Sequence, residues 1–184
     1  MDEDSLYLAQ SGDKAAINQL IVAYQQPVFN LCYRMLGERT EAEDAAQEAL
    51  VKAVMKLHTF DPERPFKPWV LRIASNECID RIRRRKPTAS LDGMGDDGAW
   101  EWKAGHSPTP EAQLLQDEEQ ARVRALLETL APIDRTLITL FYWEGLSYTE
   151  ISDATDLTVS AIKSRLFRAR RTMAALLVQE ETYA

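Results

Sequence analysis

The feature that most restricts the fold is a stretch near the middle of the chain, residues 86–111, with the sequence KPTASLDGMGDDGAWEWKAGHSPTPE. Glycine, proline, serine and aspartate resist both helix and strand, so no regular element continues through it. On either side apolar residues recur at three- and four-residue steps, and no convincing alternating β-branched run appears. We therefore predict an all-α protein with two small helical domains, at residues 1–86 and 119–184, joined by a flexible acidic linker at 87–118.

The same stretch accounts for the charge of the protein, whose formal net value is −7. Between Pro87 and Gln120 there are eight acidic residues and a single base, Lys103, so this segment carries the whole excess of negative charge. The rest of the chain is neutral overall. The total charge is therefore a poor guide to the partners of the two helical domains.

Composition excludes several classes of protein. No apolar run approaches the ~18 residues that span a membrane, and the start MDEDSLYLAQ lacks the basic-then-apolar order of a signal peptide, so we expect a cytoplasmic protein with no membrane insertion. Cys32 and Cys78 are interpreted as reduced, buried thiols. Two histidines, His58 and His106, are too few for a metal cluster, and no phosphate-binding loop or nucleophile elbow occurs. We expect no enzyme, no metal and no cofactor.

The N-terminal half is predicted to form a series of helices. Gly12 ends a short one, a second follows, and Pro27 opens a third that Gly37 closes. Thr40 and Glu43 have the spacing of a capping box at the start of a fourth helix. That helix has a narrow, mostly alanine stripe suited to close packing. Its other side carries Asp44, Gln47, Glu48 and Val51.

The next helix is expected from Pro68 to about Lys86 and ends in the basic sequence RIRRRK. Bases suit the end of a helix because of its dipole, but five bases in six residues exceed that need, so a nucleic-acid-binding helix is favoured over a solvated helix end. The aromatic residues upstream, Phe60, Phe66 and Trp69, suit either core packing or stacking on unpaired bases. For Trp69 we favour the core.

The C-terminal half has the pattern of a helix-turn-helix. Ser147 and Glu150 form a second capping box, a short helix and a tight turn follow, and a longer helix comes last. In that last helix one apolar seam is formed by Ile162, Leu166, Ala169, Met173 and Leu176. On the opposite side and its flanks lie Lys163, Ser164, Arg165, Phe167, Arg168 and Arg171. A basic face is often only solvated, but here the preceding helix and turn favour entry into the major groove of DNA.

Two segments of the chain resemble one known family. The pair EAEDAAQEALVKAVMKLHTF and FKPWVLRIASNECIDRIRRRK is similar to region 2 of the sigma-70 family, particularly of its extracytoplasmic-function (ECF) sigma factors. The segment LAPIDRTLITLFYWEGLSYTEISDATDLTVSAIKSRLFRAR resembles region 4. The two occur in the family's order, around a linker where region 3 is missing.

The resemblance implies a role for each surface. Asp44, Gln47 and Glu48 would dock on the clamp helices of the largest subunit of core RNA polymerase, and region 4 on its flap. The −10 promoter element would be recognised and opened by residues of the loop and the basic helix: Phe60, Arg64, Phe66, Lys67, Asn76, Asp80, Arg83 and Arg84. The −35 element would be read by Lys163, Ser164, Arg165, Phe167, Arg168 and Arg171. An anti-sigma factor is a reasonable further partner.

The chain departs from the family pattern at a few positions. Asp156 occupies a turn position that is often glycine, and aspartate tolerates the left-handed conformation, so we expect the turn to survive. Ser160 and Ala161 replace the common Gly-Thr, which leaves the −35 sequence preference open. Trp100 and Trp102 in the linker would anchor it to a partner or cover a small satellite core.

The leading hypothesis is therefore an ECF-type sigma factor with no catalysis of its own. One alternative is a stand-alone helix-turn-helix regulator whose N-terminal half is a sensor or dimerisation domain, although a sensor has no need of the arginine-rich helix that carries Trp69 and Asn76. Another is an adaptor that binds proteins and has lost DNA activity, against which the basic faces of both halves argue.

Overall fold

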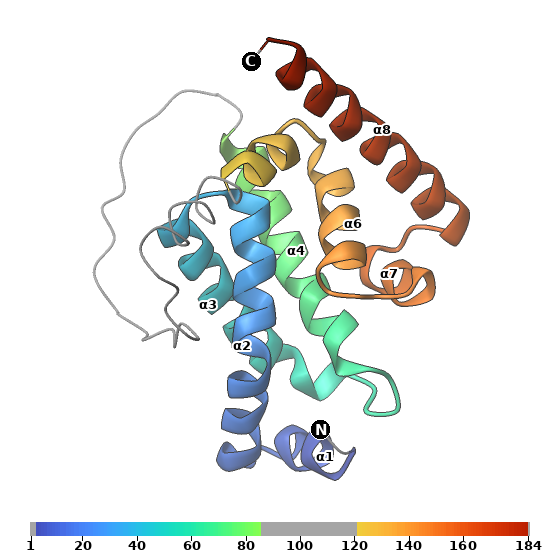
Figure 1. Ribbon diagram of the computed structural model, residues 1–184. Helices are drawn as coiled ribbons and strands as arrows, with labels where there is room; N and C mark the ends of the chain where they lie inside the picture. The colour runs from blue at the N-terminus through green and yellow to red at the C-terminus, as the bar shows by residue number, and fades with distance from the viewer. Residues whose placement is uncertain (1–2, 86–120, 184) are drawn as a thin grey trace, which may run out of the picture.

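The computed structural model describes residues 3–85 and 121–183, and every regular element in these two ranges is helical (Figure 1). The first range contains α1 (Glu3–Gln10), α2 (Lys14–Leu36), α3 (Arg39–Lys56), the short 3-10 helix η1 (Leu57–Thr59) and α4 (Phe66–Arg85). The second contains a helical segment at 121–128, then α6 (Pro132–Tyr142), α7 (Tyr148–Thr155) and α8 (Val159–Tyr183). We call these ranges the N-terminal and C-terminal bundles. The all-α prediction is confirmed; the predicted linker, with Trp100 and Trp102, lies outside the described residues.

The prediction that Pro27 opens a new helix is wrong, because α2 runs through it without a break. Proline lacks an amide hydrogen, so the carbonyl of Ala23 loses its helical donor. The buried residues Leu20, Val28 and Leu31 continue on both sides of the proline and pack against α3 and α4. This packing offsets the local cost. Gly37 ends the helix at φ 81°, as expected.

The start of α3 also differs from the expected capping box. The N-cap is Glu38, whose carboxylate accepts the backbone amides of Thr40 and Glu41 at 2.9 and 2.7 Å. Glu43 instead pairs with Arg39, one turn before it. The helix therefore begins two residues earlier than a cap at Thr40 would give, with a glutamate in the role that Ser, Thr, Asp or Asn usually fill.

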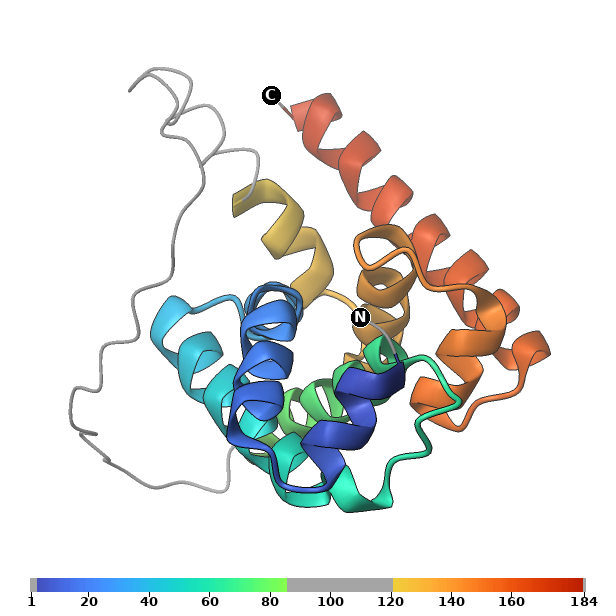
Figure 2. The ribbon, with the colours of Figure 1, turned by 90° about the horizontal axis from the view of Figure 1, so that it is seen from below.

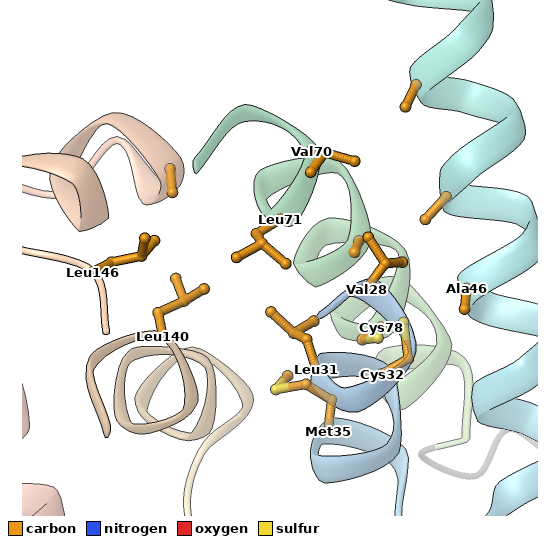
Figure 3. Packing of buried hydrophobic residues seen from close by; sticks show 14 of the residues in the cluster. Val28, Leu31, Cys32, Met35, Ala46, Val70, Leu71, Cys78, Leu140 and Leu146 are labelled. Carbon is orange, nitrogen blue, oxygen red and sulfur yellow. The ribbon is translucent and has the colours of Figure 1, made fainter. Parts of the chain in front are cut away.

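The N-terminal bundle is built around α2, α3 and α4, and α1 packs on α2 and η1. The side of α3 that faces its neighbours is made of small residues, which let the helices approach closely: Ala42, Ala45, Ala46, Ala49 and Ala53. Leu71, Ala74 and Cys78 of α4 are fully buried opposite. Cys32 and Cys78 are free thiols that lie next to each other in this core (Figure 3), as predicted for reduced cysteines.

In the C-terminal bundle, α6, α7 and α8 contact one another, and α8 extends along the outer side of the molecule, away from α2 and α3 (Figure 2). The capping box of Ser147 and Glu150 is present at the start of α7. Asp156 ends α7 in the left-handed conformation, with φ 58°, so the turn survives without glycine. Pro132 is the first residue of α6, where a missing amide hydrogen costs nothing.

The two bundles share one hydrophobic core. α6 contacts both α2 and α4, and α7 contacts α4. In Figure 3, Leu140 and Leu146 of the C-terminal bundle point toward Leu71, with Leu31 and Met35 beside them. All five side chains are buried. The apolar contact between the bundles is therefore part of one continuous hydrophobic core and is not a contact between two separate surfaces.

Two arginines fasten this contact. Arg135, which is 7% exposed, donates to the carbonyl of Met35 and, at 3.0 Å, to that of Glu128. Arg124 donates to the hydroxyl of Tyr33 at 2.7 Å. Burial lowers the pKa of Arg135, the nearby Glu128 carboxylate opposing that shift. Backbone carbonyls thus accept hydrogen bonds from both terminal nitrogens of Arg135, whose guanidinium would otherwise be buried at a higher cost.

Candidate nucleic-acid interface

The last helix separates an apolar seam from an exposed polar face. Ile162, Leu166 and Ala169 are buried against the C-terminal bundle. Five of the six candidate −35 residues are exposed on the other side: Lys163, Ser164, Phe167, Arg168 and Arg171. Phe167 is 59% exposed although it is aromatic. Packing within the chain does not explain an exposed phenylalanine surrounded by basic side chains, so this face of the helix is a candidate binding surface.

Arg165 differs from the other five. Its guanidinium donates to the carboxylate of Asp134 at 2.9 Å, and the side chain is partly buried. The pair joins α8 to α6. Arg165 therefore holds α8 against α6, while the other five candidates are exposed and can face a ligand.

The helix before the turn is held rigidly. The hydroxyl of Ser147 caps α7, and the carboxylate of Glu150 accepts the backbone amide of Ser147 at 2.8 Å. These hydrogen bonds, first the side chain and then the backbone of Ser147, lower the pKa of Glu150. The ammonium group of Lys163, at the start of α8, lies 5.2 Å from the centroid of the Tyr148 ring, within the distance at which a cation is attracted to an aromatic face. The short helix, the turn and the long helix therefore form one unit.

In the N-terminal bundle, the aromatic candidates form a cluster around residues 60–69. Phe60 and Phe66 are 5% and 7% exposed, and Trp69 is partly buried. The three rings lie with centroids 5.0–5.2 Å apart. Core packing, which we favoured for Trp69, therefore describes Phe60 and Phe66 as well. For either phenylalanine to stack on a base, the loop has to move.

Gln10 holds this loop from outside, a contact that the sequence did not reveal. Its side-chain amide donates to the carbonyls of Leu57, at 2.9 Å, and of Phe60. α1 is thereby tied to the point where the loop begins. A single glutamine in an amphipathic helix carries no pattern, so only the packing of α1 on η1 could have shown it.

Along α4, the remaining −10 candidates share an exposed face. Asn76, Asp80, Arg83 and Arg84 are exposed at positions one and two turns apart. Arg83 lies 3.7 Å from Asp80, a loose ion pair that leaves the guanidinium accessible. This face is therefore available for contact with a polyanion.

Next to this exposed face, α4 is anchored to α3 by a buried carboxylate. Glu77, with a side chain 6% exposed, bonds Lys52 at 2.6 Å and Arg81 at 2.8 Å. Burial alone would raise the pKa of Glu77, but the hydrogen bonds and charges of Lys52 and Arg81 outweigh it and lower the pKa. Because Lys52 belongs to α3, the Glu77–Lys52 pair fixes the rotation of α4 about its axis, and with it the direction of its exposed face.

Two cations near the start of α4 are occupied by the C-terminal bundle. The ammonium group of Lys67 lies 2.7 Å from the carbonyl and 3.2 Å from the carboxylate of Glu144. Arg72, which we had not singled out, binds the carbonyl of Asp153 at 3.0 Å and the carboxylate of Asp156. Arg64 is exposed, 3.7 Å from Asp61. The structure thus brings Lys67 against the other bundle, and leaves Arg64 exposed with only a loose ion pair to Asp61.

The candidate docking residues lie beside an apolar groove. Asp44 and Glu48 are exposed on α3, and Gln47 lines a cavity of about 360 Å³ between α2 and α3. The other lining residues are Ile21, Gln25, Leu50, Val51, Val54 and Met55. Val51 and Met55 are 56% and 70% exposed. Exposed apolar side chains next to acids are typical of a protein-binding surface.

Within residues 3–85 and 121–183, no helix is long and apolar enough to cross a membrane, and no group of three or more His, Cys, Asp or Glu side chains could hold a metal ion.

Comparison with known proteins gives the same two parts of the chain. The family model of sigma-70 region 2 matches residues 20–88, and that of sigma-70 region 4 matches residues 120–173. The chain is 34% identical to the ECF RNA polymerase sigma factor SigW of Bacillus subtilis, over 89% of this chain and 90% of that one. It is 33% identical to the RNA polymerase sigma factor CnrH of Cupriavidus metallidurans, over 96% and 95% of the two chains.

Solved structures share the fold. CnrH in complex with the cytosolic domain of CnrY superposes with a TM-score of 0.72 at 29% identity, covering 97% of both chains. The sigma factor RpoE of Bartonella quintana, in complex with the anti-sigma factor NepR, superposes with a TM-score of 0.63 at 23% identity, over 87% of this chain and 95% of that one. The latter shows the fold alone.

Proposed function

The chain belongs to the ECF sigma factors of the sigma-70 family, and from that premise we propose how its parts divide the work of promoter recognition. As a sigma factor it binds core RNA polymerase and directs it to promoters. We assign residues 1–86 to core docking and to recognition and opening of the −10 element, 87–118 to the linker, and 119–184 to the −35 element. The protein acts as an initiation factor in the cytoplasm, without catalysis of its own.

One observation carries the DNA-binding role: the polar face of α8 is exposed between Lys163 and Arg171, while Ile162, Leu166 and Ala169 on the opposite side are buried. Lys163, Arg168 and Arg171 supply charge for phosphates and donors for guanine edges. Ser164 and Phe167 lie among them and can contact base edges and thymine methyl groups. Arg165 is assigned a lesser share, because its guanidinium already binds Asp134.

In the N-terminal bundle, the exposed face of α4 is proposed to follow the −10 DNA. Arg83 and Arg84 provide the charge, and Asn76 and Asp80 provide polar groups that can bond base edges. Phe60 and Phe66 take part once the loop has opened, since a flipped base is read by stacking and by its hydrogen-bonding edge.

Core docking is proposed for the face of α3 that carries Asp44, Gln47 and Glu48. The adjoining groove supplies apolar area through Val51 and Met55. Apolar contacts at the centre with charges around them are the usual anatomy of a protein interface. We also propose that an anti-sigma factor controls the protein, by analogy with the relatives above.

Run-off transcription tests this proposal. Purified core polymerase is combined with the full chain and a panel of genomic promoter fragments. Initiation that depends on the chain is the expected result. If no fragment is transcribed and the chain alone binds duplex DNA tightly, the stand-alone regulator replaces the sigma factor. Asp44→Ala with Gln47→Ala should reduce core binding in a pull-down and leave duplex binding by the chain unchanged.

A further inference from the structure

The start of α4 carries a pair of cations, Lys67 and Arg72, that both turn toward the C-terminal bundle. Each is bonded to one carbonyl and one carboxylate of that bundle, and all four acceptors are oxygen atoms. The side chains are 36% and 38% exposed, so they line the edge of the contact and are not enclosed in the core.

A cavity of about 270 Å³ lies beside them, between the loop of the N-terminal bundle and α7. Its walls include Arg64, Arg72 and Trp69 from the N-terminal bundle, and Glu150 and Asp153 from α7. Cations next to an aromatic ring are the combination that binds single-stranded nucleic acid: phosphates pair with the basic side chains, and a nucleobase stacks on the ring. The facing wall, by contrast, is acidic.

We propose that Lys67 and Arg72 bind the phosphates of the promoter strand, and that the C-terminal bundle masks them by placing Glu144 and Asp156 where phosphates would lie. This inference rests on the proposed function. It adds Arg72 to the residues proposed to bind the −10 DNA, and it makes the carboxylates of Glu144 and Asp156 competitors for that DNA within the same chain. The free protein then holds the Lys67–Arg72 part of its −10 surface closed, although the face of α4 from Asn76 to Arg84 and the recognition face of α8 are open.

The ion pairs of Arg72 and Lys67 are of a strength that allows phosphates to replace the carboxylates. Asp156 has a side chain 71% exposed, and ion pairs this open to water are weak and easily replaced. Glu144, with a side chain 6% exposed, holds Lys67 more firmly. A phosphate that displaces either carboxylate keeps the cation neutralised. DNA therefore replaces an internal partner at these positions, and few counterions are released.

That difference can be measured as a salt dependence. For single-stranded DNA, the logarithm of the binding constant falls with the logarithm of salt concentration by about 0.7 for each phosphate contact that releases a counterion. In the wild type, the contact of Arg72 adds little to this slope, because Asp156 already neutralises it. With the carboxylate removed, the same contact adds its full share.

The experiment titrates a fluorescein-labelled, random-sequence single-stranded 20-mer with the full chain at several salt concentrations and follows anisotropy. Asp156→Asn is the test variant, because asparagine also tolerates the left-handed conformation that this position adopts. We expect its slope to be steeper by about 0.7, which corresponds to about fivefold tighter binding at 0.1 M salt. Glu144→Gln combined with Asp156→Asn should steepen the slope by about 1.4.

Two controls separate masking from a general change of charge. In Arg72→Gln/Asp156→Asn the gain should vanish relative to Arg72→Gln alone. Glu43→Gln also removes one negative charge and releases one arginine, Arg39, but on α3; its slope should equal that of the wild type. Thermal unfolding by circular dichroism establishes that each variant is folded.

The inference is overturned if Asp156→Asn leaves the slope unchanged, if the gain persists without Arg72, or if Glu43→Gln gives the same gain. Any of these results assigns the Arg72–Asp156 pair to interdomain packing alone. Run-off transcription by the wild type is independent of them, so failure of the masking and failure of the sigma-factor assignment are told apart.

Discussion

The two basic surfaces of the molecule differ in what covers them. On α8, Arg168 and Arg171 point into solvent. At the start of α4, Lys67 and Arg72 bind oxygen atoms of the other bundle. A DNA-reading helix supported only by its own seam is ready for its ligand. The Lys67–Arg72 surface lies beside a domain contact and can bind DNA only after that contact changes. The same chain therefore holds one preformed and one conditional DNA-binding site.

The contact that keeps the second surface closed depends on apolar packing between the bundles. Leu140 is fully buried there, and Leu140→Ala should lower the free energy of unfolding by about 2–5 kcal/mol, through lost transfer energy and the cavity that remains. Urea denaturation measures this loss. The variant should also bind the random 20-mer more tightly than the wild type under conditions where both are folded.

Val22→Ala is the matched control for this substitution, because Val22 is 57% exposed on α2. Its free energy of unfolding should stay within about 0.5 kcal/mol of the wild type. A loss at Leu140 no greater than that at Val22 would mean that the bundles are not held together by this packing, and the difference between the two surfaces would need another cause.

The exposed basic face of α8 can be tested without disturbing the contact between the bundles. Arg168→Ala should weaken −35 recognition by about 1–3 kcal/mol, as expected for an arginine that contacts a base edge, and leave core binding unchanged. Promoter competition assays with holoenzyme measure the first, and a pull-down with core polymerase the second.

Arg170→Ala serves as control for Arg168→Ala, since Arg170 is also exposed on α8 but contacts the hydroxyl of Tyr142 at 3.3 Å. We expect a much smaller effect on −35 use. Equal losses for the two variants would indicate that α8 contributes only general positive charge.

These surfaces were predictable to different degrees. The seam of Ile162, Leu166 and Ala169 follows helical periodicity, which fixes the opposite face as well, so the sequence predicts α8 and its exposed bases. Local chemistry also predicts the Ser147 capping box and the left-handed Asp156. All of these depend on residues within one or two turns of each other.

Features set by distant packing were not predictable. Pro27 favours a helix start locally, yet the core on both sides of it carries α2 through. One local feature was missed as well: a serine or threonine is the expected cap, yet Glu38 takes that role at α3. The partners of Arg165, Lys67 and Arg72 lie more than thirty residues away. Periodicity places a side chain on a face, but only the tertiary structure shows what the face meets.

A smaller effect is expected at the cap of α7, the helix that presents Asp153 and Asp156 to α4. Ser147→Ala removes the hydroxyl that caps the helix and should cost about 0.5–2 kcal/mol of stability. Urea denaturation would show it. Ser147→Asp, which retains an acceptor at the cap, should recover most of the loss; a variant with alanine as stable as the wild type would show that the cap is not needed.

The smallest effect concerns acid pH at Glu77, the carboxylate that joins α4 to α3. The pKa of Glu77 is lowered in the folded protein, so its contribution to stability is complete above the unfolded pKa, near 4.5, and is lost as pH falls through the folded value. Glu77→Gln should therefore lower stability at pH 7 and flatten the dependence of stability on pH below about 4.5. Unfolding followed from pH 7 to pH 3 measures both; parallel curves for the two proteins would remove Glu77 from this role.

The most direct test of the central claim compares two lysines in the free, full-length protein. Lys163 lies on the open face of α8, and Lys67 is bound to Glu144 across the domain contact. Timed acetylation with an amine-reactive ester, followed by mass spectrometry, gives the rate of modification of each. The account predicts slower modification of Lys67 than of Lys163, with the rate at Lys67 rising when core polymerase is added. Equal rates at the two lysines in the free protein would contradict it.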